Sequence, residues 1–217
     1  MKKVALIVAG GMGKRMNTNI PKQFLLLNNL PILMQTIKLF SHFEKIVLVL
    51  PHSQFDYWDA LCKKHNFKEE LTLVAGGGNR FHSVKNGLNK VPNNSAVAIH
   101  DGVRPLVSKT LIDNLIYKTK KGIGVIPIVP VKDSFRKVEE ENSIPINRIN
   151  LHKIQTPQCF LSSEIKNAYK QEFSKKFTDD ATVFENYGGE IKTILGEEQN
   201  IKITTKEDLS VAKIFMQ

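Results

Sequence analysis

The chain has 217 residues, of which 41% are hydrophobic and 24% charged, and its formal net charge is +10 at pH 7. This length and composition are typical of one sizeable folded domain and exclude a disordered or repetitive chain. No apolar run approaches the roughly 20 residues of a membrane-spanning helix, so we expect no membrane partner, and the positive charge favours an anionic partner such as a nucleic acid or a phosphorylated small molecule.

Short apolar runs rich in Val and Ile predict the first five strands, at residues 3–9, 45–50, 71–75, 96–100 and 124–130. They are apolar on both faces, which is typical of parallel strands covered by helices on both sides. Helical patterns separate them, at residues 31–43, 53–65, 79–91 and 108–122. This alternation, with its short connections, predicts an α/β fold with a Rossmann-like open, mostly parallel sheet and helices on both faces.

The alternation stops after the fifth run. Residues 131–158 have no clear helical period and contain the polar turn "EEENS". We therefore expect a protruding β-arm over residues 132–155, and since an isolated hairpin is only marginally stable, we expect it to pack on a second subunit. Helices at 162–173, 179–189 and 206–216, with strands at 190–195 and 200–204, then complete a single domain over 1–217.

The cysteines and histidines favour an intracellular protein without a metal site of its own. Cys62 and Cys159 lie far apart with no CxxC motif, which is typical of a reduced, cytoplasmic compartment. The apolar run 4–9 is shorter than the roughly 7–15 residues of a signal-peptide core. The six histidines show no metal-ligand spacing, so we expect no protein metal site.

A glycine-rich loop, "VAGGMGKRMNTNIPKQ" at 8–23, follows the first strand. In open α/β sheets ligands bind beyond the carboxyl ends of the strands, so this loop is well placed for function. A dinucleotide fingerprint starting at Gly11 fails at Met16, and a P-loop fails at Val8 and at Arg15. The loop belongs to neither of these two motifs.

The same loop still suits phosphate. Backbone N–H groups from Gly10 to Gly13 can bind phosphate oxygens. Arg15 and Lys22 follow, and two cations can stabilise the charge that develops on a triphosphate attacked at its α-phosphorus. A tight turn with solvated cations is the alternative interpretation.

Polar residues also follow other predicted strands. "HDGVRP" at 100–105 contains Asp101 and Arg104, and "GGGNRFHSV" at 76–84 leaves room for a base against its glycines, with Arg80 and Ser83 as donors. The remaining candidates near strand ends or the arm are Arg148, Thr156, Thr178, Asp179 and Lys202. Each of them alone could be ordinary surface polarity, but all are predicted on one side of the sheet.

Taken in order, these motifs resemble one enzyme family. The matching stretches are "AGGMGKRM…PKQ", "GGGNRFHSV", "HDGVRP", "PVKDS", "QTPQCF", "TDDA" and "NIKITT", spread over nearly the whole chain. They are similar to those of the 2-C-methyl-D-erythritol 4-phosphate cytidylyltransferases of non-mevalonate isoprenoid synthesis. The resemblance implies CTP as co-substrate and Mg²⁺ held mainly by the CTP phosphates. It also implies attack of a polyol phosphate on the CTP α-phosphorus, and a homodimer in which each arm reaches the partner.

The resemblance also implies a role for each matching position. The first-loop residues that would stabilise the transition state are Arg15 and Lys22. Those that would bind the nucleotide are Ala9, Gly10, Gly11, Gly13, Gly77, Gly78, Ser83, Asp101 and Gly102. Those that would bind the acceptor substrate are Asp101, Arg104, Ser134, Arg148, Thr156, Thr178 and Lys202. Within that group, Arg148 and Lys202 would hold the attacking phosphate in line and complete the catalytic set.

Some positions depart from the family pattern. Gly10 and Gly102 replace an alanine of many members, Gly78 replaces a small acid, and Ser134 stands where Thr is usual. These changes leave open the related ribitol-5-phosphate cytidylyltransferases. "VPVKDSFRKV" and "TDDATVFENYGG" favour methylerythritol phosphate. From another class, a basic nucleic-acid-binding module is the alternative, but no basic-aromatic nucleic-acid motif accompanies the charge, so we expect no nucleic acid partner.

Overall fold

The computed structural model describes residues 1–11 and 20–216. Its centre is an eight-stranded sheet in the order β10-β7-β11-β6-β1-β4-β5, with β12 paired to β7. The parallel part consists of β1 (Lys2–Val8), β4 (Lys45–Leu50), β5 (Thr72–Ala75) and β6 (Ser95–Asp101), and β12 (Glu190–Leu195) runs parallel to β7 (Ile123–Pro130). The predicted α/β class with an open, mostly parallel sheet is confirmed.

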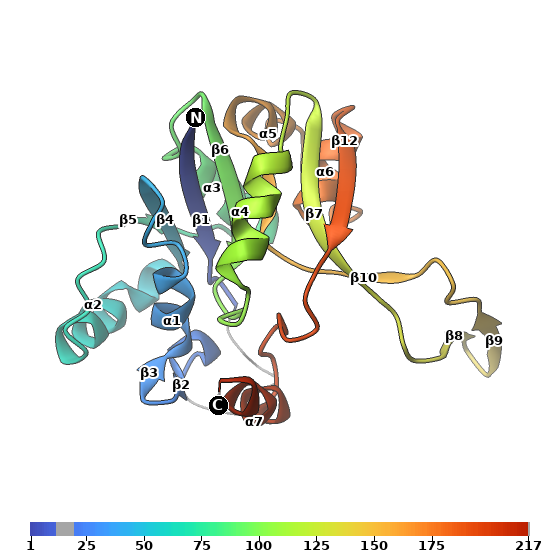
Figure 1. Ribbon diagram of the computed structural model, residues 1–217, viewed down its shortest axis with the longest axis horizontal. Helices are drawn as coiled ribbons and strands as arrows, with labels where there is room; N and C mark the ends of the chain where they lie inside the picture. The colour runs from blue at the N-terminus through green and yellow to red at the C-terminus, as the bar shows by residue number, and fades with distance from the viewer. Residues whose placement is uncertain (12–19, 217) are drawn as a thin grey trace.

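Helices cover both faces of this sheet (Figure 1). One face packs against α1 (Ile32–Lys38), α2 (Phe55–Lys64) and α4 (Lys109–Lys118), and the other against α3 (Arg80–Leu88), α5 (Ser162–Ala168) and α6 (Asp180–Asn186). Alternation along β1 explains the two layers: Ala5 and Ile7 lie in the first core, Val4 and Leu6 in the second. A third, smaller cluster joins α7 (Lys206–Phe215) to the chain around Leu27 and Val103.

Backbone hydrogen bonds to neighbouring strands fix the loops at the carboxyl edge of the parallel strands. Ala9 N–H donates to the carbonyl of Val49 (2.9 Å), and Gly76 N–H donates to that of Leu50 (2.8 Å). Gly102 N–H likewise donates to the carbonyl of Val8 (2.9 Å). The exits from β1, β5 and β6 are therefore fixed at one edge. The 3-10 helix η2 (Lys22–Phe24) and the short pair β2 (Leu26–Leu27) and β3 (Leu30–Pro31) follow the first loop.

Two sequence predictions about strands need correction. Residues 200–204 do not form a strand: Ile203 N–H donates to the carbonyl of Val103 (3.0 Å), but no ladder follows. A strand that the sequence did not predict, β11 (Gln158–Leu161), lies between β6 and β7 and runs antiparallel to both. The predicted excursion ends at Gln158, the first residue of β11, and the sequence assigns the other three residues to no element.

The arm protrudes from the sheet as predicted (Figure 1). Its hairpin pairs β8 (Phe135–Glu139) with β9 (Asn142–Ile146), and every residue of both strands is exposed. The chain then returns to the main sheet through β10 (His152–Ile154), which pairs with β7. Large apolar side chains remain exposed on the arm, including Val138 (67%), Ile144 (60%) and Ile149 (78%).

Candidate active site

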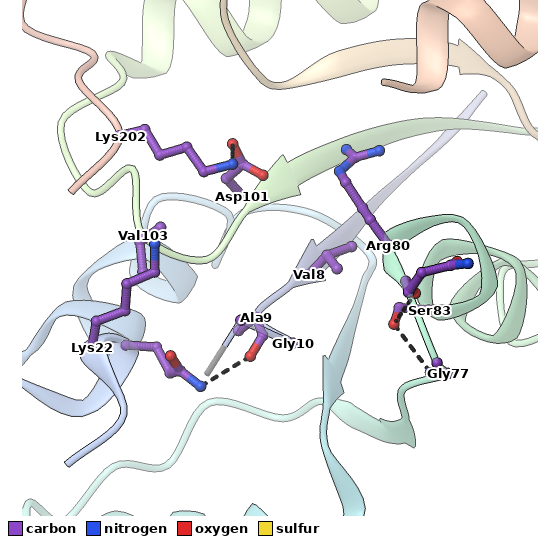
Figure 2. A pocket seen from close by; sticks show the side chains of 14 residues that line it. Val8, Ala9, Gly10, Lys22, Gly77, Arg80, Ser83, Asp101, Val103 and Lys202 are labelled. Carbon is purple, nitrogen blue, oxygen red and sulfur yellow. Dashed lines mark hydrogen bonds and ion pairs between the residues drawn. The ribbon is translucent and has the colours of Figure 1, made fainter. Parts of the chain in front are cut away.

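A cleft of about 330 Å³ opens at the carboxyl edge of the sheet (Figure 2). Three loops contribute to it, those that follow β1, β5 and β6, together with η2 and the segment before α7. Its described lining residues are Val8, Ala9, Gly10, Gly11, Lys22, Gln23, Gly77, Gly78, Asn79, Arg80, Ser83, Asp101, Val103 and Lys202. Most of the residues predicted to bind a nucleotide thus lie around one cavity.

Local geometry explains the glycines of the loop that follows β5. Gly77 N–H donates to Ser83 Oγ (3.0 Å), and that hydroxyl donates to the carbonyl of Asn79 (2.8 Å). A Cβ at Gly77 would lie 2.4 Å from the Cβ of His82, so a larger residue would displace the start of α3. A Cβ at Gly78 would meet nothing within 4 Å among the described atoms, so this backbone faces open space.

Asp101 at the end of β6 is a buried carboxylate surrounded by cations. Its Oδ2 lies 3.1 Å from Arg104 Nε and 3.1 Å from Lys202 Nζ. Burial by itself raises the pKa of Asp101, but the charges of Lys202, Arg80 and Arg104 outweigh it and hold the pKa well below its usual value. Asp101 is therefore ionised at every physiological pH, and its charge orients the cations around it.

A second cleft, of about 280 Å³, lies beside the first. Arg80, Asp101 and Lys202 line both clefts, so the two cavities share a wall. The rest of the second cleft comes from the β6 exit, the residues around β10 and β11, and the start of α6: Arg104, Ile154, Gln155, Thr156, Gln158, Thr178 and Asp179. Five predicted acceptor-binding residues thus line the second cleft: Asp101, Arg104, Thr156, Thr178 and Lys202.

Arg104 joins this site to the segment that carries Lys202. Its Nη1 donates to the carbonyl of Asn200 (2.7 Å), while its Nε faces Asp101. Asn200 is fully buried and donates through Nδ2 to the carbonyl of Thr156 (2.9 Å). These bonds hold residues 200–202 without a β-ladder, which explains how an irregular segment keeps Lys202 beside Asp101.

Beneath Asp101, the buried His100 ring completes a chain of hydrogen bonds. Its Nε2 lies 3.0 Å from the carbonyl of Arg104, which fixes the proton on that nitrogen. Its Nδ1 then accepts from Thr156 Oγ1 (2.9 Å), and that hydroxyl accepts from the Asp101 N–H (3.1 Å). The Thr156 hydroxyl thus supports Asp101 from within the protein, although Thr156 also lines the second cleft.

We expect this histidine to make the fold sensitive to acid. Burial lowers the pKa of His100 to about 4, against an ordinary value of 6.5. Between pH 7 and pH 5 the unfolded chain binds a proton that the folded chain excludes, so the free energy of unfolding should fall by about 2 kcal/mol through this group alone. Urea unfolding at the two pH values measures the change. His100→Gln should be less stable at pH 7 but should lose less stability at pH 5, and an unaltered difference would contradict the assignment.

Other predicted residues lie elsewhere. Gly13 and Arg15 lie outside the described residues. Ser134 and Arg148 are exposed on the arm and line neither cleft, and Arg148 donates to the carbonyl of Lys132. Gly102 lies beside the first cleft, where an added Cβ would approach the Cβ of Ala9 to 2.8 Å.

The cleft linings include residues that the sequence did not assign to the site, Gln23 among them, and they give Arg80 a larger part than the sequence indicated. Gln23 donates to the carbonyl of Ala9 (3.0 Å) and to Gln54 Oε1 (2.7 Å), which fixes the far end of the first loop. Arg80 lines both clefts, although the sequence indicated only a weak donor after a glycine run. Its "GGGNR" context was the available signal, but the importance of Arg80 depends on a contact with Asp180, 100 positions further along the chain.

A glycine-lined cavity for a nucleotide and a cationic cavity for a second anion, meeting at one carboxylate, suit the transfer of a nucleotidyl group between phosphates. The fold and the site thus define a nucleotidyltransferase. The family model described as "IspD: 2-C-methyl-D-erythritol 4-phosphate cytidylyltransferase" matches residues 3–217. The chain belongs to this family.

Individual relatives agree with the family match over their full length. The 2-C-methyl-D-erythritol 4-phosphate cytidylyltransferase of Azobacteroides pseudotrichonymphae is 48% identical, with 99% of each chain covered. That of Porphyromonas gingivalis is 45% identical, covering 99% of this chain and 98% of the relative. The crystal structure of the Francisella tularensis enzyme superposes with a TM-score of 0.83 at 29% identity, covering 99% of this chain and 100% of that one.

Proposed function

We propose that this chain transfers CMP from CTP to 2-C-methyl-D-erythritol 4-phosphate, giving 4-diphosphocytidyl-2-C-methyl-D-erythritol and pyrophosphate. An oxygen of the acceptor phosphate forms a bond to the α-phosphorus of CTP, and the bond from that phosphorus to the bridging oxygen of pyrophosphate breaks. The observation that supports this proposal is the shared wall of the two clefts, where Asp101 lies between two cations. A donor and an acceptor bound on either side would meet there.

The first cleft is the proposed CTP site. Ala9, Gly10 and Gly11 would present backbone to the nucleotide, and Gly77 and Gly78 would lie against the base, with Ser83 beneath them. Gly13 and Gly102 would contact the phosphates and the ribose side. Arg15 and Lys22 would stabilise the charge on the triphosphate as the leaving group departs. Lys22 lines the cleft and is largely buried, so its charge is close to the cavity.

The second cleft is the proposed acceptor site. Arg104 and Thr178 would bind hydroxyl and phosphate groups of the polyol, and Lys202 would hold the attacking phosphate in line. The nucleophile is already a phosphate anion, so no general base is needed. Positioning and charge neutralisation can account for catalysis.

The residues fit a magnesium ion that enters with the nucleotide. Among residues 1–11 and 20–216, no group of three His, Cys, Asp or Glu side chains could hold a metal ion. Asp101 is the one carboxylate among the described lining residues of the first cleft, and both of its ion pairs use Oδ2. We propose Mg²⁺ held mainly by the CTP phosphates, with Asp101 Oδ1 as the available protein oxygen. Bound there, Mg²⁺ would neutralise charge on the phosphates.

We further propose a cytoplasmic homodimer in which the arm, residues 132–155, reaches the partner. The exposed apolar side chains of the hairpin support this, because such exposed groups mark interaction surfaces and an isolated hairpin is only marginally stable. Ser134 and Arg148 would then complete the partner's acceptor site. Both cysteines are free thiols, as suits a reducing compartment. Within the described part of the chain, no helix has the length and apolarity to cross a bilayer.

An acceptor comparison tests the proposed function. Pyrophosphate release would be measured with CTP, Mg²⁺ and either methylerythritol phosphate or ribitol 5-phosphate. We expect faster release with methylerythritol phosphate. A faster rate with ribitol 5-phosphate would identify the chain as a ribitol-5-phosphate cytidylyltransferase instead. No release with either acceptor would refute the proposal.

A further inference from the structure

A buried polar set supports the wall shared by the two clefts. Arg80 forms a bidentate ion pair with Asp180, with Nη1 to Oδ1 at 2.8 Å and Nη2 to Oδ2 at 2.6 Å. Tyr169 adds a hydrogen bond from its hydroxyl to Asp180 Oδ1 (2.5 Å). The Asp180 side chain is fully buried, whereas 31% of the Arg80 side chain remains exposed. Asp180 is therefore committed to Arg80, while Arg80 still faces the clefts.

These contacts join the elements that build the two cavities. Arg80 is the first residue of α3, directly after the glycine-rich loop of the nucleotide cleft. Asp180 is the first residue of α6, directly after Thr178 and Asp179 of the second cleft. Tyr169 is buried and its ring stacks on Phe81, with centroids 4.7 Å apart. The guanidinium is thus held by Asp180 of α6, and Asp180 is held in turn by the packed ring of Tyr169.

The position of Arg80 complements that of Lys202. In Figure 2, Asp101 lies between the two cations, with Lys202 approaching from the segment before α7 and Arg80 from α3. All three residues line both clefts. Two of the guanidinium's nitrogens face Asp180, which leaves Nε–H and the outer N–H groups for another anion. A phosphate at the shared wall would contact a cation on each side.

We propose that Arg80 is a further phosphate-binding residue of this enzyme, opposite Lys202, and that Asp180 and Tyr169 are positioning residues that fix its guanidinium. The proposal rests on the proposed function, because it assigns the acceptor phosphate to the shared wall. Arg80 binds the phosphate directly. Asp180 and Tyr169 act through Arg80 alone, because Asp180 is closed off from solvent and Tyr169 is buried.

Two variants separate binding from positioning. Arg80→Gln should raise the KM for methylerythritol phosphate by about 10- to 100-fold, the loss of one charge-assisted hydrogen bond. Asp180→Asn leaves the cation in the cleft but releases its orientation, so kcat should fall by about 10-fold with little change in that KM. Tyr169→Phe should also lower kcat, by less than Asp180→Asn does. Lys85→Gln is the matched control, since Lys85 is a cation of the same helix and lines neither described cleft.

A purely structural pair would behave differently. Both variants would then lower the melting temperature and leave KM and kcat of the folded protein within about twofold of the wild type, which would overturn the proposal. If Arg80→Gln does not fold, Arg80→Lys keeps a charge beside Asp180 but loses the bidentate geometry, and it should lower kcat as Asp180→Asn does. Calorimetric binding of inorganic phosphate, weakened by Arg80→Gln, gives a readout without turnover. An inactive wild type that still shows this weakening would refute the proposed function and leave the Arg80 site standing.

Discussion

Replacing Lys202 with glutamine is expected to lower kcat/KM for the acceptor by about 100- to 1000-fold, the usual cost of removing a donor that stabilises developing charge. Lys202 Nζ lies 3.1 Å from Asp101 Oδ2 and lines both clefts. Because 42% of its side chain is exposed, its ion pair adds little to stability, and the variant should remain folded. Pyrophosphate release at varied methylerythritol phosphate gives the measurement.

The neighbouring lysine provides the control for this variant. Lys206 starts α7, is exposed and lines neither described cleft. Lys206→Gln removes the same charge from the same part of the chain. If Lys202→Gln were no worse than Lys206→Gln, Lys202 would have no role in positioning the phosphate.

Mixed dimers should recover activity that two inactive variants lack separately. Arg148→Ala would be inactive because each acceptor site would lose the arginine supplied by its partner's arm. Combined with Lys202→Gln, each heterodimer would contain one site with both residues intact and one site with neither. Random exchange at equal concentrations makes half of the dimers mixed, so about a quarter of the wild-type activity should return.

The alternative geometry predicts a different outcome. If Arg148 served the site of its own chain, every site in the mixture would lack one residue, and no activity would return. The control is Arg136→Ala, also on the arm, where the guanidinium donates to Ser143 within the hairpin. Size measurements on each variant, and on the mixture, establish that dimers form and exchange subunits.

The order of strands and helices could be predicted from sequence because it depends on local patterns. Runs rich in Val and Ile marked five strands, and β4 and β12 have the bounds expected. The short β11 was missed because its sequence, "QCFL", contains no run of Val or Ile. Residues 200–204 have strand-like composition, but their partners are Arg104, Thr156 and Val103 rather than another strand.

The sequence indicated which residues would lie around one cleft where a motif follows a strand end, and it gave no signal where a residue depends on a distant partner. Gly77 and Asp101 line one cleft because the parallel strands β5 and β6 end at the same edge of the sheet. Lys202 reaches that cleft from an irregular segment, which Asn200 holds through Arg104 and Thr156. The pairing of Arg80 with Asp180 joins positions 100 residues apart, and no local pattern indicates it. The buried contact of His100 with Thr156 is of the same kind.

The wall common to the two clefts also affects how a turnover ends. The expected product contains both a cytidine group and a polyol phosphate in one molecule, so it can occupy the two cavities at once. Each half raises the effective concentration of the other at its own cavity. We therefore expect the product to inhibit against both substrates, because the two cavities meet at Arg80, Asp101 and Lys202.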